Sequence, residues 1–307
     1  MHDAATRPHA GGYPREGRVE RVEGAGMTGY VVSSRTSDFL QEHMFCCLCG
    51  GTVLATQKEH TPSTQFFSGK WRPQQIVVPA CANCNQATGP SDQLIAVLAR
   101  LYDRKPHPNE GDTLQKAIYG VHRSLPDVAS ELVDVSARQR RKAFEISTQI
   151  DEEVYCLNFG DRTQIHFQAF GAKLALALFY WETRRIIPAA GGATVQIWSW
   201  ADRLRGPILP NEFADILGPE QSLKQGRKNL SDQFSYSSAL ADNGNAAIFF
   251  VTLGRTFALA LSVAVNDDFF SDARHLGVFV HRPGFFFHYR NLRTIGSIKF
   301  AFNMRKN

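Results

Sequence analysis

The chain has 307 residues, of which 43% are hydrophobic and 21% charged, with a formal net charge of +5. These values are ordinary for a globular protein that can bury a proper core. The mildly basic balance permits a partner with a phosphate backbone without requiring one.

The N-terminal stretch, residues 1–35, lacks hydrophobic periodicity and is rich in Gly, Arg and Glu, so we expect a disordered tail. It contains no apolar segment of the kind found in signal peptides. Five of the six cysteines also fall within 39 positions, whereas secreted disulfide proteins distribute theirs along a short chain. We therefore expect a cytoplasmic protein whose thiols are free to bind metal.

A cysteine-rich module is expected over residues 36–104. Its end carries a helical pattern, Ser91 to Arg104, with four apolar side chains on one face (Leu94, Ile95, Leu98 and Leu101). Pro and Gly predict a hinge at 105–112, and residues 105–150 form a predicted helical connector. This connector carries a basic run, Arg138 to Lys142.

Residues 151–307 predict a larger α+β domain of unknown role. A strand is expected at 154–157 and a helix at Ile165–Arg184, with further strands at 194–200, 233–238, 246–253, 256–265, 276–282 and 285–289. The apolar stretch 246–265 is interrupted by Gly254 and Arg255, which favours a hairpin over a membrane helix. His166 and Lys173 are seven residues apart on one helix face, and we interpret that helix as the edge of the core rather than as a phosphate contact.

Two C-x-x-C pairs carry the clearest chemical signal. They are separated by 31 residues and consist of Cys46 with Cys49 and Cys81 with Cys84. Two such pairs can close a tetrahedral site around one structural zinc ion. A redox C-x-x-C is the alternative, but that chemistry uses a single pair. Cys47 is the spare thiol, because pairing Cys46 with Cys49 preserves the two-residue gap.

Between and beside the cysteine pairs lie Lys58-Glu59-His60, then the apolar run Ile76-Val77-Val78, then Asn85 directly after Cys84. In this order the chain resembles the HNH (His-Me finger, ββα-metal) nuclease superfamily, in the branch with paired cysteine knuckles. The resemblance covers roughly residues 44–95. It implies a small zinc-stapled ββα-metal finger, followed here by the larger α+β domain.

The resemblance also implies a function, that of a metal-dependent endonuclease hydrolysing phosphodiester bonds. His60 would be the general base, since imidazole can accept the proton of a water molecule at neutral pH. Glu59 and Asn85 would supply oxygen ligands for a catalytic Mg²⁺ or Mn²⁺. The expected partner is nucleic acid, DNA before RNA, with no membrane and with a protein partner still open.

Each of these residues also has a structural interpretation. Glu59 could form a salt bridge with a neighbour such as Lys58 or Arg72, and Asn85 could cap the following helix. Asp92 is expected to open that helix rather than to bind metal. The family's middle Asn has no counterpart between His60 and Cys81. The alternative function is therefore a catalytically inactive zinc finger that binds nucleic acid or a protein, including as a subunit of a larger assembly.

Overall fold

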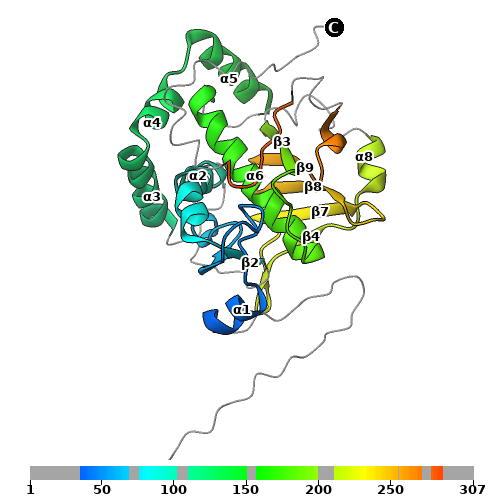
Figure 1. Cartoon of the computed structure of the whole chain (residues 1–307). Helices are drawn as coiled ribbons and strands as arrows, with labels where there is room; N and C mark the ends of the chain where they lie inside the picture. The colour runs from blue at the N-terminus through cyan, green and yellow to red at the C-terminus, as the bar shows by residue number, and fades with distance from the viewer. Residues whose placement is uncertain are drawn as a thin grey trace, which may run out of the picture.

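Helix α6 (Asp161–Thr183) is the central element of an α+β fold. In the computed structural model it packs against α2 and β2 on one side and against β3, β8 and β9 on the other. Figure 1 shows this arrangement, with the five-stranded sheet beside α6 and the helices α2 to α5 on the opposite side. The predicted α+β class is confirmed.

The structure describes residues 35–68, 76–101, 110–150, 157–199, 211–254, 256–271 and 278–285. The predicted tail, apart from Arg35, lies outside these residues. So do most of the predicted hinge, the strand predicted at 154–157 except its last residue, and nearly all of the strand predicted at 285–289.

The predicted finger forms a ββα unit. Strand β1 (Gln57–His60) runs antiparallel to β2 (Val77–Ala80), and helix α2 (Ala82–Arg100) follows directly. A short helix, α1 (Thr36–Glu42), precedes the unit, and a 3-10 turn, η1 (Thr64–Phe66), packs against α2. The helix predicted to start at Ser91 in fact starts nine residues earlier, because Cys81 caps it and it continues through Pro90.

Helices α3 (Glu110–Ser124), α4 (Pro126–Val133) and α5 (Ala137–Ile150) occupy the predicted connector. The central helix α6 matches the helix predicted at Ile165–Arg184, with a start four residues earlier. The pattern of this helix predicts Leu174, Leu178 and Trp181 as buried; Leu174 and Leu178 are fully buried, whereas Trp181 is only partly buried. In the described part of the chain, no helix is long and apolar enough to cross a membrane.

The main sheet is antiparallel and mixes long and short strands in the order β3-β9-β8-β7-β4. Its members are β3 (Gly192–Ser199), β4 (Gln221–Ser222), β7 (Phe234–Leu240), β8 (Ala246–Leu253) and β9 (Phe257–Ala264). Strands β8 and β9 confirm the predicted hairpin. The remaining elements are α8 (Asn211–Ile216), the small β5–β6 ribbon (Lys224–Gln225 and Lys228–Asn229) and η3 (Asp268–Phe270).

The prediction of a strand at 276–282 is wrong for the part that the structure describes. Its described part, 278–282, contributes a single bridge, between His281 and Ala193. Pro283 follows directly and has no backbone N–H with which to extend the pairing. The Arg282 side chain donates to the backbone oxygens of Ala190 and Gly191 and pairs with the Asp267 carboxylate.

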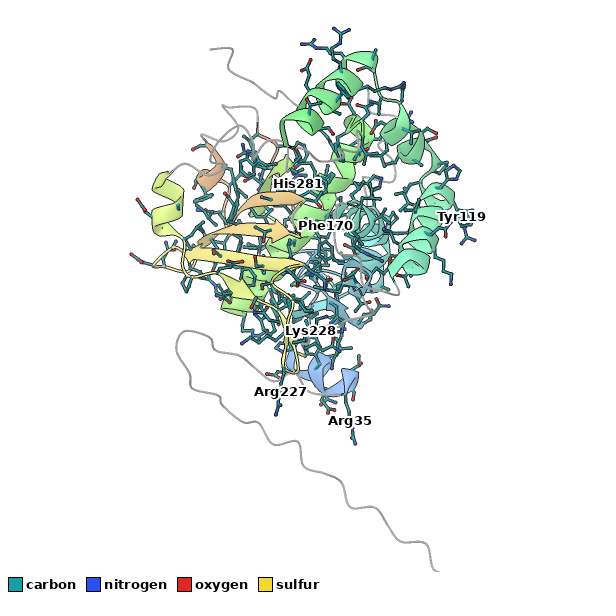
Figure 2. The ribbon with its side chains drawn as sticks, turned by 180° about the vertical axis from the view of Figure 1, so that it is seen from behind. Arg35, Tyr119, Phe170, Arg227, Lys228 and His281 are labelled. Atoms are coloured by element: carbon teal, nitrogen blue, oxygen red, sulfur yellow. The ribbon has the colours of Figure 1, made fainter. Side chains whose placement is uncertain are left out.

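One hydrophobic cluster extends across the described residues from Cys46 to Val263, so the ββα unit and the sheet share a core. Figure 2 shows Phe170 and His281 inside the molecule, beside the sheet, while Tyr119 lies on the outer surface. Gly171 allows the close approach of α6 to β3, since a Cβ added there would overlap the Val195 side chain. The finger is therefore packed on the rest of the protein through α6.

Because His281 is buried, we expect the free energy of unfolding of the protein to depend on pH. Its Nε2 donates to Gln168 Oε1 at 2.7 Å, and burial lowers the pKa of His281 to about 3. An unfolded histidine takes up its proton near pH 6.5, so the unfolded chain binds more protons below that pH and stability falls as the pH drops from about 6.5 toward 3. We expect the His281 contribution to the loss to reach about 3 kcal/mol at pH 4.

Urea unfolding at several pH values would measure this effect. His281→Gln should flatten the pH dependence, whereas the same change at exposed His122 should leave it intact. An identical slope in wild type and His281→Gln would contradict the assignment.

Candidate metal centre and adjoining carboxylate site

The four predicted cysteine ligands converge. The sulfur atoms of Cys46, Cys49, Cys81 and Cys84 all lie within 4.8 Å of one another, and all four residues are buried. This group could hold a metal ion, as predicted from the two C-x-x-C pairs. Sulfur donors in a four-fold cluster suit zinc better than magnesium or manganese.

Local backbone geometry explains why each pair forms a ligand loop. Gly50 and Gly51 follow Cys49 with φ angles of 76° and 73°, a left-handed conformation that glycine adopts without strain. The turn that they make lets the Gly51 amide donate to the Cys46 carbonyl at 3.0 Å. In the second pair, the Cys84 amide donates to the Cys81 sulfur at 3.4 Å, at the start of α2.

The thiols influence one another strongly. Hydrogen bonds from Cys46 and Cys84 lower the pKa of Cys49. The bond with Cys49 raises the pKa of Cys46 to about 12, and bonds with Cys46 and Cys49 raise the pKa of Cys84. Without a cation one thiolate therefore forms first and resists formation of the others. A bound metal ion removes this conflict, because its charge stabilises all four thiolates together.

Cys47 is not one of the four converging ligands, as predicted for the spare thiol. It is 1% exposed, and burial raises the pKa of its thiol well above the usual value. Its backbone amide donates to the Pro79 carbonyl at 3.0 Å, which ties the first cysteine loop to β2. Cys47 is thus part of the core.

His60 is the last residue of β1 and is partly buried, opposite Val77 of β2. Its neighbour Glu59 is 7% exposed and faces α6. Successive side chains of a strand point to opposite faces, so Glu59 and His60 leave β1 in different directions.

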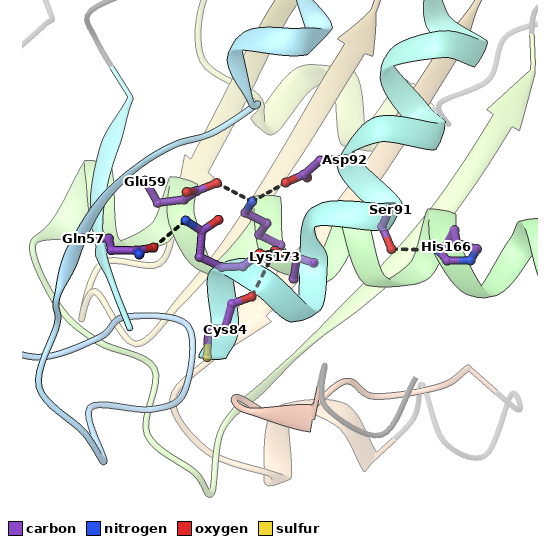
Figure 3. Close-up of polar contacts among 9 residues, drawn as sticks. Gln57, Glu59, Cys84, Ser91, Asp92, His166 and Lys173 are labelled. Carbon is purple, nitrogen blue, oxygen red and sulfur yellow. Dashed lines mark hydrogen bonds and ion pairs between the residues drawn. The ribbon is translucent and has the colours of Figure 1, made fainter. Parts of the chain in front are cut away.

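Glu59 binds Lys173, a residue that lies 114 positions away in the sequence. Lys173 Nζ is 2.6 Å from Glu59 Oε1 and also 2.6 Å from Asp92 Oδ2. Figure 3 shows Lys173 lying between the two carboxylates, with Glu59 coming from β1, Asp92 from α2 and Lys173 from α6. We call these three residues the carboxylate–lysine triad. Lys173 was not among the partners considered for Glu59 from the sequence, Lys58 and Arg72, of which Arg72 lies outside the described residues.

The triad is almost completely shielded from water. Lys173 is 1% exposed and Asp92 5%. Burial alone would lower the pKa of Lys173, yet Asp92 and Glu59 hold it above its usual value. Burial raises the pKa of Asp92, and the ammonium offsets only part of this effect. Asp92 Oδ1 is buried without a hydrogen-bond partner, so a proton there would neutralise the triad.

Asn85 lies in the first turn of α2. The predicted capping role is incorrect, because Cys81 is the capping residue. The Asn85 side chain donates from Nδ2 to Gln57 Oε1 at 2.7 Å and so joins the start of α2 to the start of β1. Asp92 likewise does not open the helix but lies inside it.

The contacts of Glu59 and Asn85 do not fit the expected Mg²⁺ or Mn²⁺ site. Glu59 already binds a buried cation, the Lys173 ammonium, and Asn85 binds a different partner, Gln57. Octahedral Mg²⁺ normally retains several waters, whereas Glu59, Asp92 and Lys173 are each less than a tenth exposed.

His166 and Lys173 both face α2 from α6, which sequence reasoning did not foresee. Ser91 Oγ lies 2.9 Å from His166 Nδ1, and burial lowers the pKa of His166 to about 4. One signal was available: Lys173 stands inside the apolar run Ala172 to Tyr180, where a charged side chain needs a buried partner.

Comparison of this chain with protein-family models, with curated proteins and with solved structures finds no match.

Proposed function

We propose that this protein is an HNH-type nuclease, a hydrolase of nucleic-acid phosphodiester bonds. The observation that carries the proposal is the ββα unit itself. Strand β1 ends in His60, β2 follows, and α2 starts within the cysteine cluster with Asn85 in its first turn. This is the order of elements and residues that the resemblance implies for such a finger.

We assign zinc to the cysteine cluster. Four buried sulfur atoms within 4.8 Å of one another match the donor set of a closed structural site, which has no open position for a substrate. The ion would join the loop before β1 to the start of α2, so its role would be to hold the finger together rather than to act on phosphate.

His60 would take the proton of the attacking water. The water oxygen then bonds to phosphorus, the bond from phosphorus to the leaving oxygen breaks, and the leaving oxygen takes up a proton from solvent. His60 is partly buried at the end of β1 and its Nδ1 atom is buried, so the attacking water would have to reach the imidazole at Nε2.

The substrate is expected to be a nucleic acid. Helix α5 carries three exposed arginines, Arg138, Arg140 and Arg141, which are suitable for contact with a phosphate backbone. Such contacts position a nucleic acid without reading its sequence.

A plasmid nicking assay tests the proposal. Zinc-loaded protein is assayed with Mg²⁺, with Mn²⁺ and with no added divalent ion. We expect His60→Ala to lower the nicking rate about 100-fold or more, the usual contribution of a general base. His122→Ala, at an exposed histidine of α3, is the matched control and should keep the wild-type rate. Equal rates for wild type and His60→Ala would contradict the role of His60.

The second candidate is a catalytically inactive zinc finger that binds nucleic acid or a protein. The observation in its favour is the ion pair of Glu59 with Lys173, which engages the carboxylate that a catalytic metal would need. This candidate predicts retained binding to DNA with no cleavage by the wild-type protein under any of the three metal conditions.

A further inference from the structure

Lys173 lies where a cation bound by Glu59 would lie. Its Nζ atom is 2.6 Å from one oxygen of Glu59 and 2.6 Å from one oxygen of Asp92. The three groups come from β1, α2 and α6, so the lysine reaches the finger from outside the ββα unit. Figure 3 shows the Lys173 side chain extending from α6 to a point between the two carboxylates.

We infer that Lys173 is the resident cation of this site: its ammonium takes the place of a divalent ion at Glu59, so that the finger binds neither Mg²⁺ nor Mn²⁺ through Glu59. The inference deepens the proposed nuclease function, on which it rests for the meaning of the site. The absence of Mg²⁺ or Mn²⁺ binding through Glu59 can be measured whether or not the protein cleaves nucleic acid.

The charge of the site prevents the Lys173 ammonium and a divalent ion from being bound at the same time. Two carboxylates balance one divalent ion, and a lysine ammonium at the same point would leave an excess positive charge in a buried site. For a divalent ion to enter, Lys173 would have to lose its proton or leave. The two carboxylates favour the protonated lysine, and each holds it by a short, charge-assisted hydrogen bond.

Packing also opposes exchange. The residues on both sides of Lys173, Ala172 and Leu174, are fully buried, as is much of α6. A displaced ammonium would therefore remain among apolar groups without a partner.

Lys173 is accordingly a positioning residue. At 1% exposure it cannot touch a nucleic acid, but it fixes β1 and α2 on α6 through their carboxylates. The orientation of the finger, including the strand that ends in His60, depends on a residue 114 positions beyond Glu59.

Titration with Mn²⁺, followed by electron paramagnetic resonance, tests the inference without relying on cleavage. Zinc-loaded wild type, Glu59→Gln and the control Asp242→Asn are compared. Asp242 is an exposed carboxylate next to β7, so its loss is a matched change of charge. We expect all three proteins to give the same Mn²⁺ binding curve. Mn²⁺ binding by wild type that disappears in Glu59→Gln would overturn the inference.

Removal of the ammonium should create the divalent site. We expect Lys173→Met to bind Mn²⁺ at least about tenfold more tightly than wild type, with the gain abolished when Glu59→Gln is added. A folded Lys173→Met with unchanged Mn²⁺ affinity would also overturn the inference. If this variant does not fold, the comparison of wild type with Glu59→Gln decides alone.

Absence of nicking with these binding results would refute the nuclease proposal and leave the inference standing.

Discussion

Removal of the metal from the cysteine cluster should unfold the finger and destabilise the whole chain. We expect Cys84→Ser to lose the bound zinc and to lower the melting temperature by more than about 10 °C. Strands β1 and β2 have four residues each, and a two-stranded hairpin of this size is at best marginally stable alone. Structural zinc contributes roughly 10–16 kcal/mol in isolated zinc fingers, comparable with the roughly 5–15 kcal/mol that stabilises a whole domain.

The effect should extend beyond the finger because the cysteines belong to the shared core. Cys46, Cys84 and the sheet residue Phe249 are members of one buried cluster. Calorimetry together with metal analysis measures the effect, with one zinc per chain expected in the wild type. Cys47→Ala is the control, since Cys47 is buried beside the cluster and is not a ligand. A metal-free protein that melts at the wild-type temperature would contradict the account.

Lys173→Met should be the most destabilising single change in the triad. Loss of the ammonium leaves Glu59 and Asp92 as two buried carboxylates with no cation between them. Breaking a buried ion pair in this way costs about 3–5 kcal/mol, because the remaining charge is not compensated. Urea unfolding at pH 7 measures the difference in the free energy of unfolding.

Neutralising the two remaining carboxylates distinguishes the loss of stability caused by unpaired charge from the loss caused by altered packing. The triple variant Lys173→Met, Glu59→Gln, Asp92→Asn should recover more than half of the lost stability, since no buried charge is left unpaired. Lys116→Met, on the exposed surface of α3, should change stability by less than about 0.5 kcal/mol. If Lys173→Met were as stable as Lys116→Met, the triad would not support the fold.

The sequence was sufficient for the parts of the fold that local patterns specify. The spacing of Cys46, Cys49, Cys81 and Cys84 indicated the cluster, because one ion requires two ligands from each short loop. The apolar pattern of α6 and the interruption at Gly254 predicted a helix and a hairpin that the structure confirms. Each of these depends on residues close in sequence or on one repeated motif.

The carboxylate–lysine triad could not be derived in the same way. Lys173 lies 81 positions from Asp92 and 114 from Glu59, and periodicity gives the face of a helix without naming what packs on it. The start of α2 was misplaced for a related reason. The apolar pattern that predicted the helix begins only after Ser91, whereas the capping Cys81 starts the helix earlier and the helix continues through Pro90 while packing on α6.

Imidazole rescue of His60→Ala is the most direct test of the central claim, that this finger hydrolyses phosphodiester bonds with His60 as the base. Plasmid cleavage by the zinc-loaded variant is followed with increasing imidazole at neutral pH, beside wild type under the same conditions. We predict a variant that is about 100-fold slower or worse, with a rate that rises with imidazole concentration while the wild-type rate does not. Cleavage by the variant at the wild-type rate without imidazole, or no cleavage by the wild type, would contradict the account.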